Sequence, residues 1–294
     1  MSGGTLVLLA GALSAAVTML VLLGARRPRA RRLRGPAALN YRGRRLPIVL
    51  GLAITAGIFV AVWAVLVADN RQQRLVHSAR ETLEILAAVL LVFTGGLLDD
   101  VQPARFHGLV RHFGELVQGR VTSGIIKMGT ALAAAAAFGV ATHQSGIRLA
   151  LGIPFVAGAA NLWNLLDVAP GRALKWFLPA VAVALALAPT DGFALFEAAA
   201  LGGAMIALLF DLAEVAMLGD SGAYVLGFVA GAGLLLQLPT PGLAVALALV
   251  VALHLLAETV TLTRLIRGIA PIRWLDDLGR LREEGLRPES SASA

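Results

Sequence analysis

The chain contains no cysteine among its 294 residues. That absence excludes disulfide bonds, thiolate nucleophiles and any metal site built from cysteine. Charged residues are also scarce, at 15% of the chain, whereas ordinary soluble domains contain about 25%. So few charges cannot cover the surface of a soluble protein of this length, which excludes a water-soluble enzyme. The lack of cysteine excludes a disulfide-bonded secreted scaffold.

Hydrophobic residues make up 58% of the chain and occur in long blocks. A soluble fold has too little interior to bury them, whereas a helix of about 20 apolar residues crosses a bilayer. We therefore predict an all-α, polytopic integral membrane protein with about nine transmembrane helices and short loops. The predicted spans are 5–24, 47–68, 82–98, 121–141, 149–166, 174–188, 193–210, 222–238 and 243–263.

The net charge of +7 is concentrated in particular loops. Nine arginines lie between Arg26 and Arg45, and the positive-inside rule places such a segment in the cytoplasm. We therefore expect a plasma-membrane protein with its N-terminus outside and its C-terminus inside. Since this basicity is explained by topology, no nucleic-acid partner is expected. Of the 25 lysines and arginines, only four fall outside on this assignment: Arg71, Arg74, Arg80 and Arg148.

Two regions are predicted along the chain. Residues 1–263 form one transmembrane domain, whose first span follows no basic residue and is therefore expected to be a span rather than a cleaved signal peptide. Residues 264–294 form a cytoplasmic basic tail. After Pro271 the apolar residues have roughly helical spacing, which predicts a short amphipathic helix on the membrane surface before a disordered end.

Four of the few acidic residues lie at predicted inner ends of spans: Asp99, Asp100, Asp167 and Asp220. Span parity alone places all four on one side of the membrane. The Asp99–Asp100 pair ends an inward-running helix, where the macrodipole is already negative, so a cation should compensate the pair. Four converging carboxylates without cysteine suit Mg²⁺ or Mn²⁺, so a divalent metal is expected among them.

Each of these acids has a simpler alternative. The Asp pair could be a solvated helix end, Asp167 could serve a turn, and Asp220 could cap the helix that follows it. Lys127, near the inner end of the next outward span, could counter a phosphate or extend to the interface.

Polar residues also occur at helical spacing within an apolar span. Asn161, Asn164 and Asp167 follow one another at intervals of three, so a helix places them on one face. Such a row is costly in lipid unless it lines a polar cavity. We expect it to contribute to the same site as the other acids.

Four motifs together resemble the polyprenyl-phosphate N-acetylhexosamine-1-phosphate transferase superfamily, which includes peptidoglycan and envelope-polysaccharide enzymes. In family order they are LNYRGRRLP at 39–47, GGLLDD at 95–100, NLWNLLD at 161–167 and AEVAMLGDSGAYVLG at 213–227. The resemblance implies transfer of a sugar-1-phosphate from a UDP-sugar to polyprenyl (undecaprenyl) phosphate, with release of UMP and dependence on Mg²⁺. A homodimer is left open.

The resemblance also implies roles for individual residues. Asp99 and Asp100 match the family's Asp pair, the first of which is often assigned to activating the lipid phosphate. Asn164 and Asp167 match contacts near the nucleotide and metal, and Asp220 matches a metal-binding acid. The metal ligands that follow from the resemblance are Asp100, Asp167 and Asp220. Lys127 is similar to the family's lysine near the phosphates.

This sequence departs from the family pattern in two places. In Asp-Val-Ala-Pro-Gly at 167–171, Pro170 replaces the family's last acid, and a His-rich cytoplasmic loop is missing. We hypothesise that Arg264, Arg267 and Arg273 take over diphosphate contacts made by those histidines, because guanidinium groups bind phosphate through paired hydrogen bonds. The alternative is that they are topology signals.

Two other function classes stay open. A catalytically silent relative could act as a membrane scaffold or regulator of envelope synthesis. A transporter would place its ionisable residues near the bilayer midplane, a pattern that only Glu258 fits better.

Overall fold

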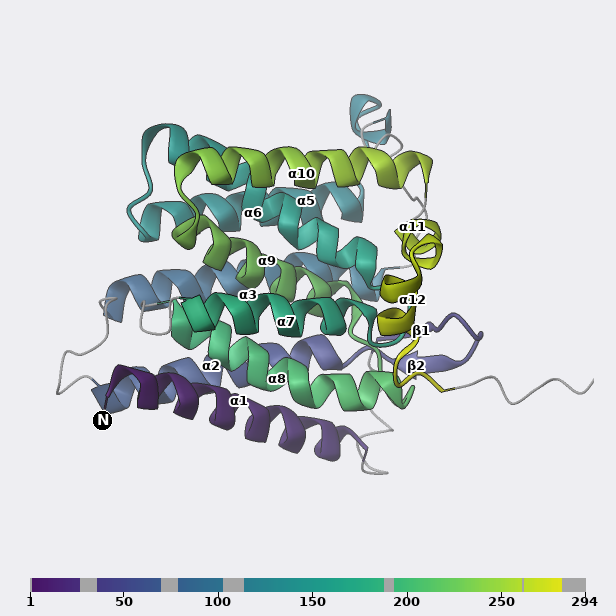
Figure 1. The fold of residues 1–294 in the computed structure, drawn as a ribbon, viewed down its shortest axis with the longest axis horizontal. Coiled ribbons are helices and arrows are strands. Elements are labelled where there is room, and N and C mark those ends of the chain that lie inside the picture. The colour runs from purple at the N-terminus through teal and green to yellow at the C-terminus, as the bar shows by residue number, and fades with distance from the viewer. Residues whose placement is uncertain are drawn as a thin grey trace, which may run out of the picture.

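A computed structural model describes residues 2–26, 36–69, 79–102, 114–187, 193–260 and 262–281. Within them the chain forms a bundle of long helices lying side by side, with the N-terminus at the end opposite a small hairpin (Figure 1). The long helices are α1 (Gly3–Ala25), α2 (Leu50–Asp69), α3 (Ala79–Val101), α5 (Ser123–Ala141), α6 (Gly146–Leu166), α7 (Arg172–Leu187), α8 (Ala194–Leu212), α9 (Gly219–Gln237) and α10 (Thr240–Thr259).

These helices match the nine predicted spans one for one. Eight of those in the described ranges are long and apolar enough to cross a membrane. The exception is α7, whose 16 residues span about 24 Å, less than the hydrocarbon core of about 30 Å. The protein is an all-α, multi-pass membrane protein, as the sequence predicts.

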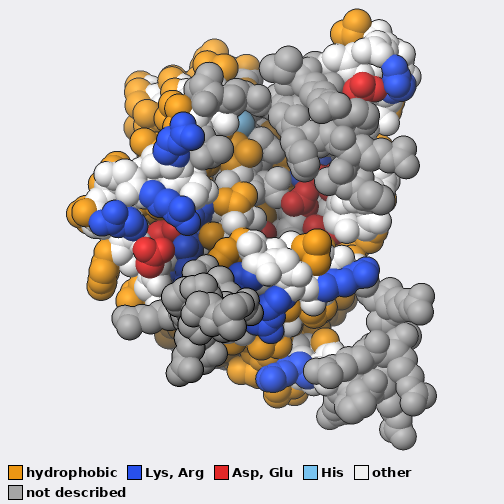
Figure 2. Space-filling view, turned by 90° about the vertical axis from the view of Figure 1, so that its right-hand side faces the viewer, with side chains coloured by type: hydrophobic (Ala, Val, Ile, Leu, Met, Phe, Trp, Pro, Cys, Tyr) orange, Lys and Arg blue, Asp and Glu red, His pale blue; other side chains and the backbone are white. Residues whose placement is uncertain are grey.

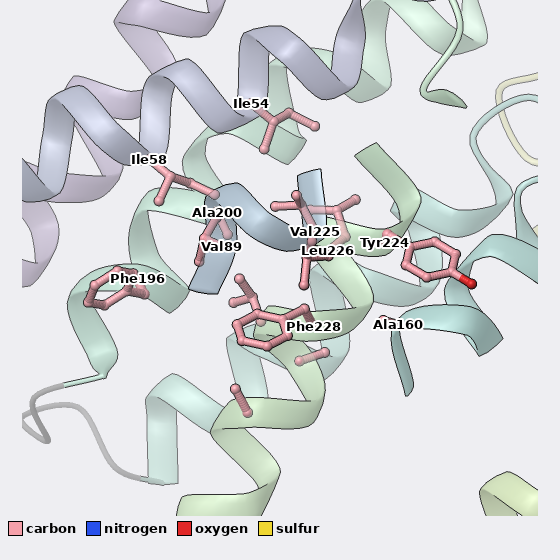
Figure 3. Close-up of a cluster of buried hydrophobic side chains, with 14 of the residues drawn as sticks. Ile54, Ile58, Val89, Ala160, Phe196, Ala200, Tyr224, Val225, Leu226 and Phe228 are labelled. Carbon is pink, nitrogen blue, oxygen red and sulfur yellow. The ribbon is translucent and has the colours of Figure 1, made fainter. Parts of the chain in front are cut away.

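Helix α9 lies at the centre of the bundle, and most of its side chains are buried. Figure 3 shows its Val225, Leu226 and Phe228 among apolar side chains of neighbouring helices. Small residues allow close approach: a Cβ on Gly222 would lie 2.7 Å from the Cα of Gly51 in α2. Without a hydrophobic force between helices in lipid, such close packing is what holds membrane helices together.

The hairpin was not predicted. Strands β1 (Ala37–Leu39) and β2 (Arg45–Pro47) pair antiparallel within the LNYRGRRLP motif. The Asn40 side-chain oxygen accepts hydrogen bonds from the backbone N–H groups of Arg42 (3.0 Å) and Arg44 (2.9 Å), which closes the turn, and Gly43 has φ +72°. An Asn followed by Gly three residues later is a turn signal that could have revealed it.

The short helices α11 (Leu262–Gly268) and α12 (Ala270–Asp277) lie at the same end of the bundle as the hairpin (Figure 1). An amphipathic helix was predicted in this part of the tail, and α12 has that character. However, Asp276 of α12 is buried against α7, so this helix is tied to the bundle rather than resting on lipid alone. Residues 282–294, predicted as a disordered end, lie outside the described residues.

Candidate functional site

The candidate site lies at the hairpin end of the bundle. There α3, α6 and α8 end and α5, α7 and α9 begin, so residues far apart in sequence are brought together. Figure 2 shows this face: acidic side chains lie in a hollow, and basic side chains lie around it. We call Asp99, Asp100, Asp167 and Asp220, with Lys127 and Asn164, the acidic cluster.

Lys127 connects two of the acids. Its Nζ lies 2.6 Å from Oδ2 of Asp99 and 2.6 Å from Oδ2 of Asp220, and the residue is only 6% exposed. Nζ also lies 4.8 Å from the ring centroid of Tyr224, a cation–π contact. The alternative that Lys127 extends to the membrane interface is therefore wrong, because its charge points into the cluster.

Asn164 joins the same ion pair. With its amide oriented by its neighbours, the nitrogen donates to Oδ1 of Asp220 (2.8 Å) and the oxygen accepts from Nζ of Lys127 (3.3 Å). The side chain of Asp220 is thus used on Lys127 and Asn164. It does not cap α9, which has no side-chain cap of its own, so that alternative for Asp220 is also wrong.

Asp100 performs the capping instead, from another helix. Its Oδ1 accepts from the backbone N–H of Asp220 (2.7 Å), and its Oδ2 accepts from the N–H (3.0 Å) and Oγ (2.7 Å) of Ser221. The carboxylate therefore faces the positive end of the α9 dipole. Gly219 makes room for it: φ is +73°, and a Cβ there would lie 2.9 Å from Oδ1 of Asp100.

The adjacent carboxylates Asp99 and Asp100 thus have different partners. One faces an ammonium group and the other a helix N-terminus. The predicted cation is therefore present for Asp99, as Lys127, whereas Asp100 is compensated by the helix N-terminus instead. The pair is not a solvated helix end.

Asp167 lies just after α6, in the turn 167–171. Burial raises the pKa of its carboxyl well above the usual value, and repulsion from Asp211, Asp220 and Asp100 raises it further. The turn is held on one side by Asp211, whose Oδ2 accepts from the backbone N–H of Gly171 at 2.7 Å. Asp167 therefore lies close enough to the other acids for their charges to act on it, as span parity predicts.

Asn161 shares a helix face with Asn164 but belongs to a second network. Its Oδ1 accepts from the Tyr224 hydroxyl (2.5 Å), and its Nδ2 lies 2.9 Å from Nε2 of His254. His254 Nδ1 donates to the carbonyl of Val250, which leaves Nε2 to accept from Asn161. Through Tyr224 this polar chain extends from Lys127 towards α10. Neither Tyr224 nor His254 was among the predicted site residues.

The predicted arginines lie elsewhere. Arg264, Arg267 and Arg273 are exposed, and within the described ranges they form no hydrogen bond or ion pair with the acidic cluster. The basic residues that are buried near the turn 167–171 are Arg172 and Lys175, which the sequence argument overlooked. Their position at the start of a span, directly after a site motif, was the available signal.

Glu214 is a further acid that sequence reasoning missed. It has φ +50° and is 2% exposed. It accepts from Asn40 Nδ2 (3.0 Å) and the Tyr41 hydroxyl (3.2 Å), and it pairs with Arg42 (3.2 Å). Glu214 thereby attaches the hairpin to the loop that leads into α9. Glu258, the residue considered for a transporter, has a side chain outside the described residues.

The donor chemistry of the acidic cluster fits a divalent cation. Its potential metal ligands are carboxylate and amide oxygens, which are the donors that Mg²⁺ and Mn²⁺ prefer. Burial and, after it, the nearby acids raise the pKa of Asp167, and a bound cation would oppose that shift. Among the residues that the structure describes, no three acidic or histidine side chains are already gathered as a metal cage. Asp167 and Asp220 are the residues that would hold the ion, with Asp100 directed to α9.

Comparisons of the chain with protein-family models and with curated proteins found no match.

Proposed function

We propose that this protein transfers a sugar-1-phosphate from a UDP-N-acetylhexosamine to polyprenyl phosphate and releases UMP. The observation that carries the proposal is Lys127, a buried ammonium group at 2.6 Å from both Asp99 and Asp220, within a cluster that holds more acids than cations. The same residues match the family motifs, in the family's order. A solvated helix end or a helix cap needs no such arrangement.

The reaction requires charge compensation more than a strong base. An oxygen of the lipid phosphate attacks the sugar-linked phosphorus of the UDP-sugar. The bond from that phosphorus to the bridging oxygen breaks, and UMP leaves with that oxygen. The lipid phosphate is already mostly ionised at neutral pH, because its second pKa is about 6. The barrier therefore lies in bringing two anions together in line.

Lys127 and Asn164 are suited to that task. The ammonium group of Lys127 can turn from a carboxylate to a phosphate oxygen, and Asp99 and Asp220 keep it charged and placed. Asn164 positions both Lys127 and Asp220. Asp100 holds the start of α9, and with it Asp220, in place.

A Mg²⁺ ion, or Mn²⁺, bound by Asp167 and Asp220 would supply neutralisation of the diphosphate. The carboxylates need such a cation in return, since Lys127 alone cannot balance them. We expect activity to require the metal and to vanish with EDTA.

The proposed location is the cytoplasmic face of the plasma membrane, with the N-terminus outside. Arg42, Arg44 and Arg45 lie at the same end of the bundle as the acidic cluster, whereas Arg80 and Arg148 lie at the other. This distribution follows the positive-inside rule. The acids lie at helix ends rather than at the midplane, which favours an enzyme over a transporter.

The test incubates purified protein with Mg²⁺, undecaprenyl phosphate and a panel of UDP-N-acetylhexosamines, and measures UMP release. We expect release with at least one sugar, dependent on the lipid, and none from Asp220→Asn. A folded wild-type protein that releases no UMP with any member of the panel would instead favour a silent scaffold or regulator.

A further inference from the structure

Helix α12 is held to the bundle by a buried ion pair. The guanidinium of Arg172, at the start of α7, donates two parallel hydrogen bonds to Asp276, Nε to Oδ1 at 2.8 Å and Nη2 to Oδ2 at 2.9 Å. The two side chains are 1% and 2% exposed. Such bidentate pairs fix geometry in a way that single contacts do not.

Other basic groups complete the arrangement. Arg280 donates to Oδ1 of Asp276 at 2.6 Å, and Lys175 Nζ donates to the backbone carbonyls of Leu275 (3.2 Å) and Asp276 (2.6 Å). Burial by itself would raise the pKa of Asp276. Hydrogen bonds from Arg172 and the charges of Arg172 and Arg280 outweigh burial and lower that pKa. We call Arg172, Lys175, Asp276 and Arg280 the basic brace.

The basic brace reaches the turn that carries Asp167. Arg280 Nε donates to the carbonyl of Pro170 at 3.0 Å, and Arg172 directly follows that turn. On its other side the turn is held by the contact from Gly171 N–H to Asp211. The stretch 167–171 is therefore fixed between α8 and the C-terminal segment. It includes Pro170, the position at which this sequence departs from the family pattern.

We propose that Asp276 is a positioning residue, which through Arg172 and Arg280 fixes the turn 167–171 and so places the Asp167 carboxylate in the acidic cluster. The C-terminal helix is then part of the site rather than an appended tail. The structural half of this inference stands by itself, and only its effect on turnover rests on the proposed function.

The absence of cysteine makes a labelling test direct, since a single introduced thiol is the only one. Ala173→Cys places it beside Arg172 at a buried position, where it reacts with a water-soluble maleimide only when the turn opens. Val168→Cys, at an exposed position, reports unhindered labelling. Asp276→Asn should accelerate labelling of Cys at 173 by at least about tenfold, because removing one partner leaves Arg172 buried and uncompensated.

Asp277→Asn is the matched control. Asp277 is the next residue, and its side chain is 65% exposed. It contacts Nη1 of Arg280 at 3.3 Å, whereas Arg280 reaches Pro170 and Asp276 through Nε and Nη2, so Asp277→Asn should leave labelling unchanged. A folded Asp276→Asn protein that labels no faster than Asp277→Asn overturns the proposal. If Asp276→Asn does not fold, Arg280→Gln decides, because it removes the contact to Pro170 and leaves the Arg172–Asp276 pair: faster labelling supports the proposal, and unchanged labelling overturns it.

A turnover measurement then separates positioning from general stability. In Asp276→Asn the Mg²⁺ concentration for half-maximal activity should rise about tenfold while kcat at saturating Mg²⁺ falls less, and Asp276→Glu should recover part of the loss. Equal losses at all Mg²⁺ concentrations would contradict positioning of Asp167. If wild-type protein shows no turnover, the proposed function fails, but the labelling result still tests the brace.

Discussion

The two charged clusters at the hairpin end have opposite balances. The acidic cluster contains four carboxylates and one lysine, and Lys127 pairs with only two of those acids, Asp99 and Asp220. In the basic brace, Arg172 and Arg280 bind the single carboxylate of Asp276, and Lys175 binds the backbone carbonyl of the same residue. A buried cluster whose charges are matched by hydrogen bonds can be structural, whereas one with excess charge needs a further ion or a substrate.

The turn 167–171 lies between the two clusters. Asp167 enters the acidic cluster at one end of the turn, and Pro170 accepts from Arg280 at the other. Under the proposed function the acidic cluster carries the chemistry and the basic brace supports it, and substitutions can test whether the two clusters differ in this way.

The largest effect is expected at Asp220. Asp220→Asn removes the charge that faces Lys127 and Asn164, and with it a proposed metal ligand, so UMP release should fall by at least about 10³-fold. The protein should stay folded, with a melting temperature at most a few degrees lower, because Lys127 keeps Asp99 as a partner and the α9 N-terminus is capped by Asp100. Near-normal turnover in this variant would remove the acidic cluster from the chemistry.

The Asp pair should separate chemistry from structure. Asp99→Asn and Asp100→Asn should each lower the rate by at least about 10²-fold. Asp100→Asn should cost more stability, about 0.5–2 kcal/mol, because it loses a charged acceptor of two backbone N–H groups at α9, whereas in Asp99→Asn the buried Lys127 keeps Asp220 as a partner. Thermal unfolding of both variants measures the difference, and equal melting temperatures would refute the capping role.

Sequence reasoning predicted the spans and the meeting of the acids for a simple reason. Apolar blocks of bilayer length define the helices, and parity then decides which ends share a side. Lys127 could be placed near Asp99 and Asp220 on that ground. What parity cannot predict is partner choice: nothing local in GGLLDD shows that Asp99 faces an ammonium group while Asp100 faces a helix end.

The pairing within the basic brace could not be predicted from the sequence, for a different reason. Arg172 and Asp276 are 104 residues apart, and loop arginines near a last span read as topology signals. The sequence therefore indicated Arg264, Arg267 and Arg273, which are exposed, and gave no reason to pair Arg172 with an acid of the tail. Burial of a polar pair depends on how helices pack, and packing was not readable from periodicity.

Asp167 offers a test by pH and metal. Its raised pKa means that folding favours the protonated carboxyl, so stability without metal should fall as pH rises from the ordinary carboxyl pKa of about 3.9, with the full penalty above the folded-state pKa. At neutral pH in EDTA, Asp167→Asn should thus raise the melting temperature by about 2–4 °C, the shift expected for about 1 kcal/mol in a chain of this size.

Added Mg²⁺ should reverse the order of the two proteins. It should stabilise wild type, because a bound ion removes the repulsion, and should have little effect on Asp167→Asn. A wild-type melting temperature that does not respond to Mg²⁺ at neutral pH would argue against a metal at Asp167.

The smallest effect is expected at the exposed arginines. Arg264→Gln, Arg267→Gln and Arg273→Gln each remove a charge that lies outside both clusters, so KM for the UDP-sugar and kcat per molecule should change less than about twofold, as for most surface substitutions. If these arginines instead replace the family's histidines at the diphosphate, KM should rise about tenfold or more with insertion unchanged. Steady-state kinetics normalised to inserted protein distinguishes the two, with Asp277→Asn as an exposed control on the same segment. A large KM effect would mean that the outer face of the tail also binds substrate. The C-terminal segment would then take part in the chemistry directly, and not only by holding the turn 167–171 in place.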